Sequence, residues 1–145
     1  MDQVSTRIVF GTILHTQLKD LDENALRLVY ENFIDPIRRG YTIEELPGKY
    51  KPSWLLKDHV FNNQMKKAIA DFAKKNDLHH YHYGYPFYVT GRDPDFFGHE
   101  SDGILHTVNR VADDFYEHVI FRVDECHPTP FSVPFDLSIN SSVFL

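Results

Sequence analysis

The pattern of apolar and polar residues predicts a strand followed by a helix in the first forty residues. Residues 7–16 are rich in β-branched and aromatic side chains, as is typical of a β-strand. Asp20 and Asp22 are suitable N-caps for a helix. The apolar residues that follow have the three-to-four spacing of one helical face: Leu26, Val29, Tyr30, Phe33 and Ile37. Pro36 disturbs the end of this helix, and Gly40 closes it.

A second helix is predicted after a loop that contains several turn-forming residues. The loop covers residues 41–53 and holds Pro47, Gly48 and Pro52. The apolar residues that then recur at helical spacing are Phe61, Met65, Ala68, Ile69 and Phe72. This helix ends at 76–77, where an Asn-Asp pair breaks the pattern.

Strand-like runs follow at residues 78–89, 104–111 and 117–125. A polar loop (90–103) separates the first two runs, and residues 112–116 are typical of a hairpin turn between the last two. The element order is therefore β-α-α-β-β-β. This order predicts an α+β fold in which two helices cover one face of an antiparallel sheet, and the opposite face is free to carry a site.

The C-terminal tail is predicted to lie outside the centre of the sheet. It contains Pro128, Pro130 and Pro134, and proline is excluded from central strands because it lacks a backbone N–H. The apolar residues 139–145 are expected either to dock on the domain or to form an edge strand with a partner. We expect residues 1–145 to form a single domain with a proline-containing tail.

Nine histidines in 145 residues is a high count, and the two-residue period of a strand predicts which of them share a face. The pairs predicted to point the same way are His80 and His82, His106 and Arg110, and His118 and Arg122. If the last two runs pair as a hairpin, their four residues come within reach of one another. The expected site therefore lies on the sheet face away from the helices.

Composition limits the class of protein. A mass of 17.0 kDa and 42% hydrophobic residues fit one ordinary domain with a single core. No apolar run approaches the roughly 18 to 20 residues of a membrane span, and residues 1–3 lack the start of a secretory leader. The single cysteine, Cys126, cannot form an internal disulfide, so cytoplasmic residence is expected. We interpret Cys126 as an inert thiol, because its neighbour His127 would point away from it on a strand.

The net charge of −6 argues against nucleic-acid binding, but the charges are unevenly distributed. Residues 38–75 contain nine Lys and Arg and four Asp and Glu, a net charge of +5. Residues 93–136 contain two Lys and Arg and ten Asp and Glu, a net charge of −8. This asymmetry permits a basic patch on an acidic protein. Solvated helix faces beside an acidic tail explain it equally well.

Ribonuclease chemistry is the first candidate for the histidines. Cleavage of RNA through its own 2′-OH needs a base, an acid and a cation for the developing charge, and histidine with arginine supplies all three. The candidate catalytic residues are His80, His82, His106, His118, Arg122 and His127. The candidate substrate-binding residues are Arg110, Tyr81, Tyr83, Tyr85, Lys66 and Lys67. Tyrosine can stack on unpaired bases. For most of these rings, however, packing in the core is the simpler interpretation.

A metal site is the second candidate. His80 and His82 form an H-x-H pair, and His106, His118 or Glu100 could complete a set of three ligands. No HExxH motif or cysteine cluster supports such a site. Acid–base use is therefore favoured, and neither a metal nor another cofactor is expected.

The chain resembles the RelE/ParE-like toxin superfamily, and within it the YafO type. The resemblance rests on the element order and on three stretches of the C-terminal half: 102–108, 113–123 and the Cys-His-Pro at 126–128. It implies a toxin of a type II toxin–antitoxin pair, an mRNA endoribonuclease that is usually ribosome-dependent, needs no metal and is silenced by a cognate antitoxin. The roles that it implies fall on His80, His82, His106, Arg122 and His127. The chain departs from the family in its acidic net charge and in a C-terminus that does not end as a basic helix.

Two alternatives remain open. The superfamily includes toxins that act on protein targets such as gyrase, and an acidic face suits a protein partner better than RNA. A metal-dependent hydrolase built on the same histidines is the other alternative. The expected partners are an antitoxin, mRNA and the ribosome, and no membrane.

Overall fold

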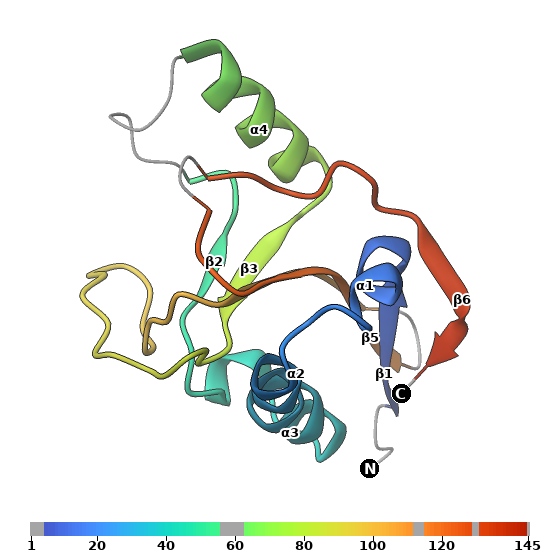
Figure 1. The fold of residues 1–145 in the computed structure, drawn as a ribbon. Coiled ribbons are helices and arrows are strands. Elements are labelled where there is room, and N and C mark those ends of the chain that lie inside the picture. Colours follow the sequence, from blue (N-terminus) through green and yellow to red (C-terminus); the bar gives the residue numbers. More distant parts are fainter. Residues whose placement is uncertain (1–4, 56–62, 112–114, 129–130, 145) are drawn as a thin grey trace.

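The computed structural model describes residues 5–55, 63–111, 115–128 and 131–144 (Figure 1). At its centre lies a sheet with the strand order β2-β3-β4-β5-β1-β6. The strands of this part of the chain are β1 (Ser5–Gly11), β2 (Tyr50–Pro52), β3 (His79–His82), β4 (Ile104–Val111), β5 (Phe115–Asp124) and β6 (Ile139–Phe144). The helices are α1 (Thr12–Gln17), α2 (Glu23–Val29), α3 (Asp35–Arg38) and α4 (Asn63–Lys75), with a π-helical turn at Tyr30–Ile34 and a 3-10 turn at Ile43–Glu45. The α+β class predicted from the pattern is confirmed.

The sheet is mixed, so the expectation of a purely antiparallel sheet was wrong. β1 pairs with β5 in parallel, with Ile8 opposite His118, whereas the other neighbouring strands are antiparallel. Two parallel neighbours need a long connection, and here most of the chain lies between them. The first strand is also shorter than expected: it ends at Gly11, and Thr12–Gln17 forms α1 instead.

Helices cover both faces of the sheet, which corrects the prediction of two helices on one face. Residues of α2, the π-helical turn and α3 pack in one core cluster with Tyr81, Leu105 and Ile120. Residues of α4 pack in a second cluster with Ile104 and Val119. Figure 1 shows α4 and the α2–α3 segment on opposite sides of the sheet. The strand β2 lies between α3 and α4 in the sequence and at the sheet edge, so the chain changes sides there.

The residues that the sequence offers as the start and end of the first predicted helix have these roles in the structure. The Asp22 side chain accepts a hydrogen bond from the Asn24 N–H, as expected of an N-cap. Gly40 has a φ of +100°, the left-handed conformation that ends many helices. Among the described residues, no helix combines the length and apolar character needed to cross a membrane.

A β-bulge in β5 changes which side chains share a face. His106 lies opposite Arg122 and Thr107 lies opposite Ile120, so Phe121 has no partner on β4. The extra residue shifts the alternation of β5 by one position. Phe121 packs in the α4-side cluster, and Arg122 faces His106 on that same side.

The C-terminal segment docks on its own domain. Phe131 and Val133 are buried in the α4-side cluster. The chain then adds β6 to the edge of the sheet, antiparallel to β1, with Ile139 opposite Gly11. The tail therefore avoids the centre of the sheet, as its prolines predict, and covers part of the face that was expected to be open.

Gly48 is expected to tolerate no side chain. A Cβ there would lie 1.8 Å from the carbonyl oxygen of His82, a backbone atom that cannot move aside without distorting β3. Gly48→Ala should lower the free energy of unfolding by about 3 kcal/mol, measured by urea titration. Pro47→Ala, at the exposed neighbouring position, is the control. Equal urea midpoints for Gly48→Ala and wild type would contradict this packing.

Candidate functional site

Four histidines gather on the α4 side of the sheet, and we call them the histidine cluster: His80, His82, His106 and His127. The ring centroids of His80, His82 and His127 are 5.9 to 6.1 Å apart in all three pairs. Phe131 packs against this group, with its ring centroid 5.1 Å from His80 and 6.1 Å from His106. The C-terminal segment thus holds the cluster against the sheet.

Strand pairing explains how the cluster forms. His80 and His82 point to the same face because they are two residues apart in β3. His80 lies directly opposite His106 on β4. His127 follows the end of β5 and turns back over β3. Three separate segments therefore supply the four imidazoles.

Asp124 anchors one side of the cluster. Its carboxylate accepts hydrogen bonds from Nε2 of His106 at 2.8 Å and from Nη2 of Arg122 at 2.9 Å. The same Nη2 reaches the carbonyl and hydroxyl oxygens of Ser132. Burial opposes ionisation of Asp124, but these partners outweigh it and lower its pKa. An ionised Asp124 therefore fixes the positions of His106 and Arg122.

His106 carries an unpaired nitrogen. Its ring is fully buried, and Nδ1 has no hydrogen-bond partner in the described part of the chain. Because Nε2–H donates to Asp124, the lone pair of the neutral ring lies on Nδ1. A buried polar atom without a partner costs roughly 1 to 3 kcal/mol, and folded proteins contain few such atoms.

In two other rings of the cluster, hydrogen bonds indicate which of the two nitrogens carries the proton. Nδ1 of His82 lies 2.7 Å from the carbonyl oxygen of Ser101, and Nδ1 of His127 lies 3.2 Å from that of Pro128. A carbonyl oxygen only accepts, so both rings carry their proton on Nδ1. The Ser101 N–H also points at the same His82 nitrogen, at 3.1 Å, but the contact with the carbonyl oxygen is the shorter of the two and favours a proton on Nδ1. Each ring is left with a basic lone pair on Nε2.

Burial keeps the cluster uncharged. It lowers the pKa of His82 to about 4, and it lowers the pKa of His80, His106 and His127 as well. The neighbouring imidazoles reinforce the effect on His80. At neutral pH the four rings are therefore uncharged.

Lys49 adds a cation to the same face. Its Nζ lies 2.6 Å from Oε1 of Glu100 and 3.7 Å from Oδ2 of Asp93. Lys51 contacts the same Asp93 carboxylate at 3.1 Å. The positive charge of Lys49 is among the causes that lower the pKa of His80, His82 and His127.

Two of the residues predicted to join the histidines lie elsewhere. His118 is on the opposite face, where it bonds Asn109 at 2.6 Å and meets the ring of Phe33 edge-on. The bulge is the reason, because it places Arg122 but not His118 on the side of His106. Arg110 is exposed and lies 3.6 Å from Glu117 near the far end of β4.

The predicted substrate-binding residues are dispersed. Tyr81 and Tyr83 are fully buried in the core on the α2–α3 side, so their rings offer no surface for stacking, and the interpretation as core residues is confirmed. Tyr85 is partly buried and packs against that core. Lys66 and Lys67 lie on α4, where Lys67 is exposed and Lys66 is partly exposed.

No preformed metal site is seen in the described ranges: no three His, Cys, Asp or Glu side chains there are placed to hold an ion. Of the residues considered as a third ligand, His118 lies on the wrong face to join His80 and His82. Cys126 is an exposed free thiol.

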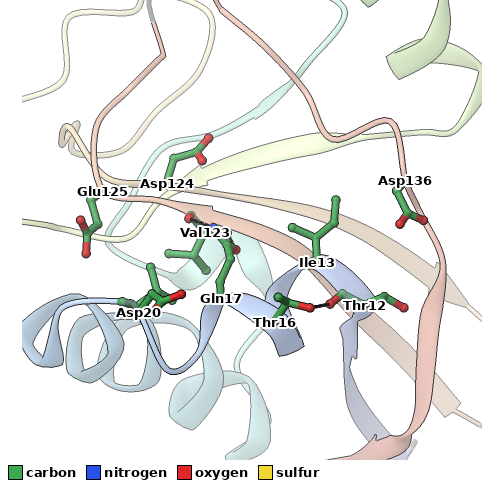
Figure 2. Close-up of a pocket in the computed structure, with 10 residues that line it drawn as sticks. Thr12, Ile13, Thr16, Gln17, Asp20, Val123, Asp124, Glu125 and Asp136 are labelled. Atoms are coloured by element: carbon green, nitrogen blue, oxygen red, sulfur yellow. Dashed lines mark hydrogen bonds between the residues drawn. The ribbon is translucent and has the colours of Figure 1, made fainter.

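A hollow of about 560 Å³ lies beside α1 and the end of β5 (Figure 2). Asp20, Asp124, Glu125 and Asp136 are among its lining residues. Such a concentration of carboxylates repels phosphate, so the hollow does not favour RNA. Asp124, which lines this hollow, also bonds His106 of the histidine cluster.

Comparisons with protein-family models, with curated proteins and with solved structures found no match for this chain.

The stability of the protein should fall in mild acid. The pKa of His82 is lowered from its ordinary 6.5 to about 4 in the folded protein. Between these two pH values the unfolded chain binds more protons than the folded protein, so the free energy of unfolding rises with pH in this range. Urea titrations should give a lower free energy of unfolding at pH 5 than at pH 7, with His82 alone contributing up to about 3 kcal/mol once the pH is below 4. His82→Gln should weaken the pH dependence, whereas His15→Gln, outside the cluster, should not. A stability that stays constant from pH 7 to pH 4 would show that the cluster is not buried as described.

Proposed function

We propose that the protein is an endoribonuclease of the RelE-like kind, a toxin that cleaves mRNA with the histidine cluster as its catalytic centre. One observation carries the proposal: His80, His82, His106, Arg122 and His127, five candidates from three separate segments, converge on one face of the sheet. The resemblance in sequence to the YafO type supports the choice of RNA as substrate. A cognate antitoxin and the ribosome are the partners that this function entails.

The base in this mechanism is an imidazole with a free Nε2. His82 and His127 both meet that condition, because each holds its proton on Nδ1 against a carbonyl oxygen. Such a base takes the proton of the 2′-OH, and the 2′-oxygen then attacks the adjacent phosphorus. His127 is the more exposed of the two, which makes it the first choice for the base.

The acid is an imidazole that gains its proton when RNA binds. Without RNA, burial holds the pKa of every ring in the cluster below its ordinary value. A phosphate placed beside the cluster favours an imidazolium and raises these pKa values again. One protonated and one neutral ring then provide the acid and the base.

Cleavage should depend on His82 and His127. Purified protein is incubated with a translating extract, and new mRNA 5′ ends are mapped. His82→Ala and His127→Ala should each slow cleavage by about 100-fold or more, because each removes an imidazole of the proposed acid–base group. His15→Ala, which changes an exposed histidine outside the cluster, should cleave like wild type.

Three outcomes separate this proposal from its rivals. A substrate with 2′-deoxyribose at the cleaved linkage should resist cleavage, because the attacking oxygen is missing. Cleavage that EDTA abolishes and zinc restores would point instead to a metal-dependent hydrolase. Growth arrest without any new mRNA end would contradict the proposal and favour a protein target.

A further inference from the structure

The starting point is a buried lysine that the acid–base mechanism above does not use. Lys49 is only 7% exposed, although a lysine is seldom buried unless its charge is paired. Its ammonium is held by Glu100 and, more loosely, by Asp93. Glu100 is the more accessible of these partners, with 29% of its side chain exposed, so it can move aside when another anion arrives.

The backbone places Lys49 next to the proposed catalytic rings. The His82 N–H donates to the Lys49 carbonyl at 3.0 Å, which continues the β2–β3 register by one position beyond Tyr50 and Tyr81. Lys49 is thus the cross-strand neighbour of His82, as Lys51 is of His80. Its positive charge helps to lower the pKa of His80, His82 and His127.

Arg122 is poorly suited to serve as the cation of this site. Its Nη2 already contacts Asp124 and both oxygens of Ser132, and its buried Nε has no partner among the described residues. Movement toward a phosphate would leave the partly buried Asp124 without one of its two partners. Arg122 is therefore a positioning residue for Asp124 and His106.

We propose that Lys49 binds the phosphate being cleaved. Until RNA binds, the Glu100 carboxylate pairs with the Lys49 ammonium, and the RNA phosphate then displaces this carboxylate. This inference rests on the proposed ribonuclease function. An imidazole Nε2 takes the 2′-hydroxyl proton, the 2′-oxygen bonds to phosphorus, and the bond from phosphorus to the 5′-oxygen breaks. An imidazolium protonates that 5′-oxygen, and the products are a 2′,3′-cyclic phosphate and a 5′-hydroxyl. Lys49 donates hydrogen bonds to the non-bridging oxygens throughout and is not consumed.

The test measures single-turnover cleavage of mRNA in ribosome complexes for Lys49→Gln, with Lys51→Gln as the matched control. Lys51 contacts the same Asp93 but lies two cross-strand pairs further from His82, opposite His80. Lys49→Gln should slow cleavage by about 100-fold, as the loss of one preorganised donor to a transition-state oxyanion does. Lys51→Gln should cleave at nearly the wild-type rate, and Lys49→Arg should recover part of what Lys49→Gln loses.

A double variant separates catalysis from folding. Lys49→Gln leaves Glu100 and Asp93 facing each other without their shared cation, which alone can weaken the fold. Lys49→Gln with Glu100→Gln removes one of these charges and should restore the thermal midpoint while cleavage stays slow. Recovery of cleavage together with stability would overturn the inference, as would a wild-type rate for Lys49→Gln. If the wild-type protein itself cleaves no RNA, the proposed function fails and this inference falls with it.

Discussion

The bulge between β4 and β5 is the constraint on which the rest of the site depends. With Phe121 unpaired, Arg122 and Asp124 come to the same side as His106, and Val123 turns to the opposite core. A regular ladder would have reversed these assignments and left His106 without its carboxylate. The contact between His106 and Asp124, and with it the position of Arg122, follows from this one irregularity. Bulges recur next to active sites for this reason, because they redirect side chains without changing the fold.

Burial then sets the chemical state of the site. Phe131 packs over His80 and His106, which are buried with His82, and the pKa values of the cluster are lowered, so its rings are neutral at physiological pH. Neutral rings that are hydrogen-bonded through Nδ1 are prepared to accept protons at Nε2. The positive charge of the site comes from Lys49 and Arg122, and both are held by carboxylates. In the proposed mechanism an anionic substrate replaces Glu100 at Lys49, and this exchange would connect RNA binding with the charge that cleavage needs.

The α+β class of the fold and part of the site could be predicted from the sequence, and the failures have physical causes. The two-residue period correctly places His80 with His82 on one face, and β4 pairs with β5 as the predicted hairpin requires. The same period places His118 with Arg122, which is wrong because the pattern of side chains does not reveal a bulge. The parallel pairing of β1, the position of α4 on the second face and the partnership of Lys49 with Glu100 depend on contacts between distant segments. Nothing in the local pattern near Lys49 distinguishes it from the solvated lysines of α4.

The tautomers of His82 and His127 give the most direct test of this account. Long-range ¹H–¹⁵N NMR spectra of the imidazole rings report which nitrogen carries the proton and whether a ring is charged. We predict that at pH 7 both rings are neutral and protonated on Nδ1, and that His82 titrates only near pH 4. Rings that are charged at pH 7, or that carry their proton on Nε2, would contradict the claim that this fold prepares them as bases.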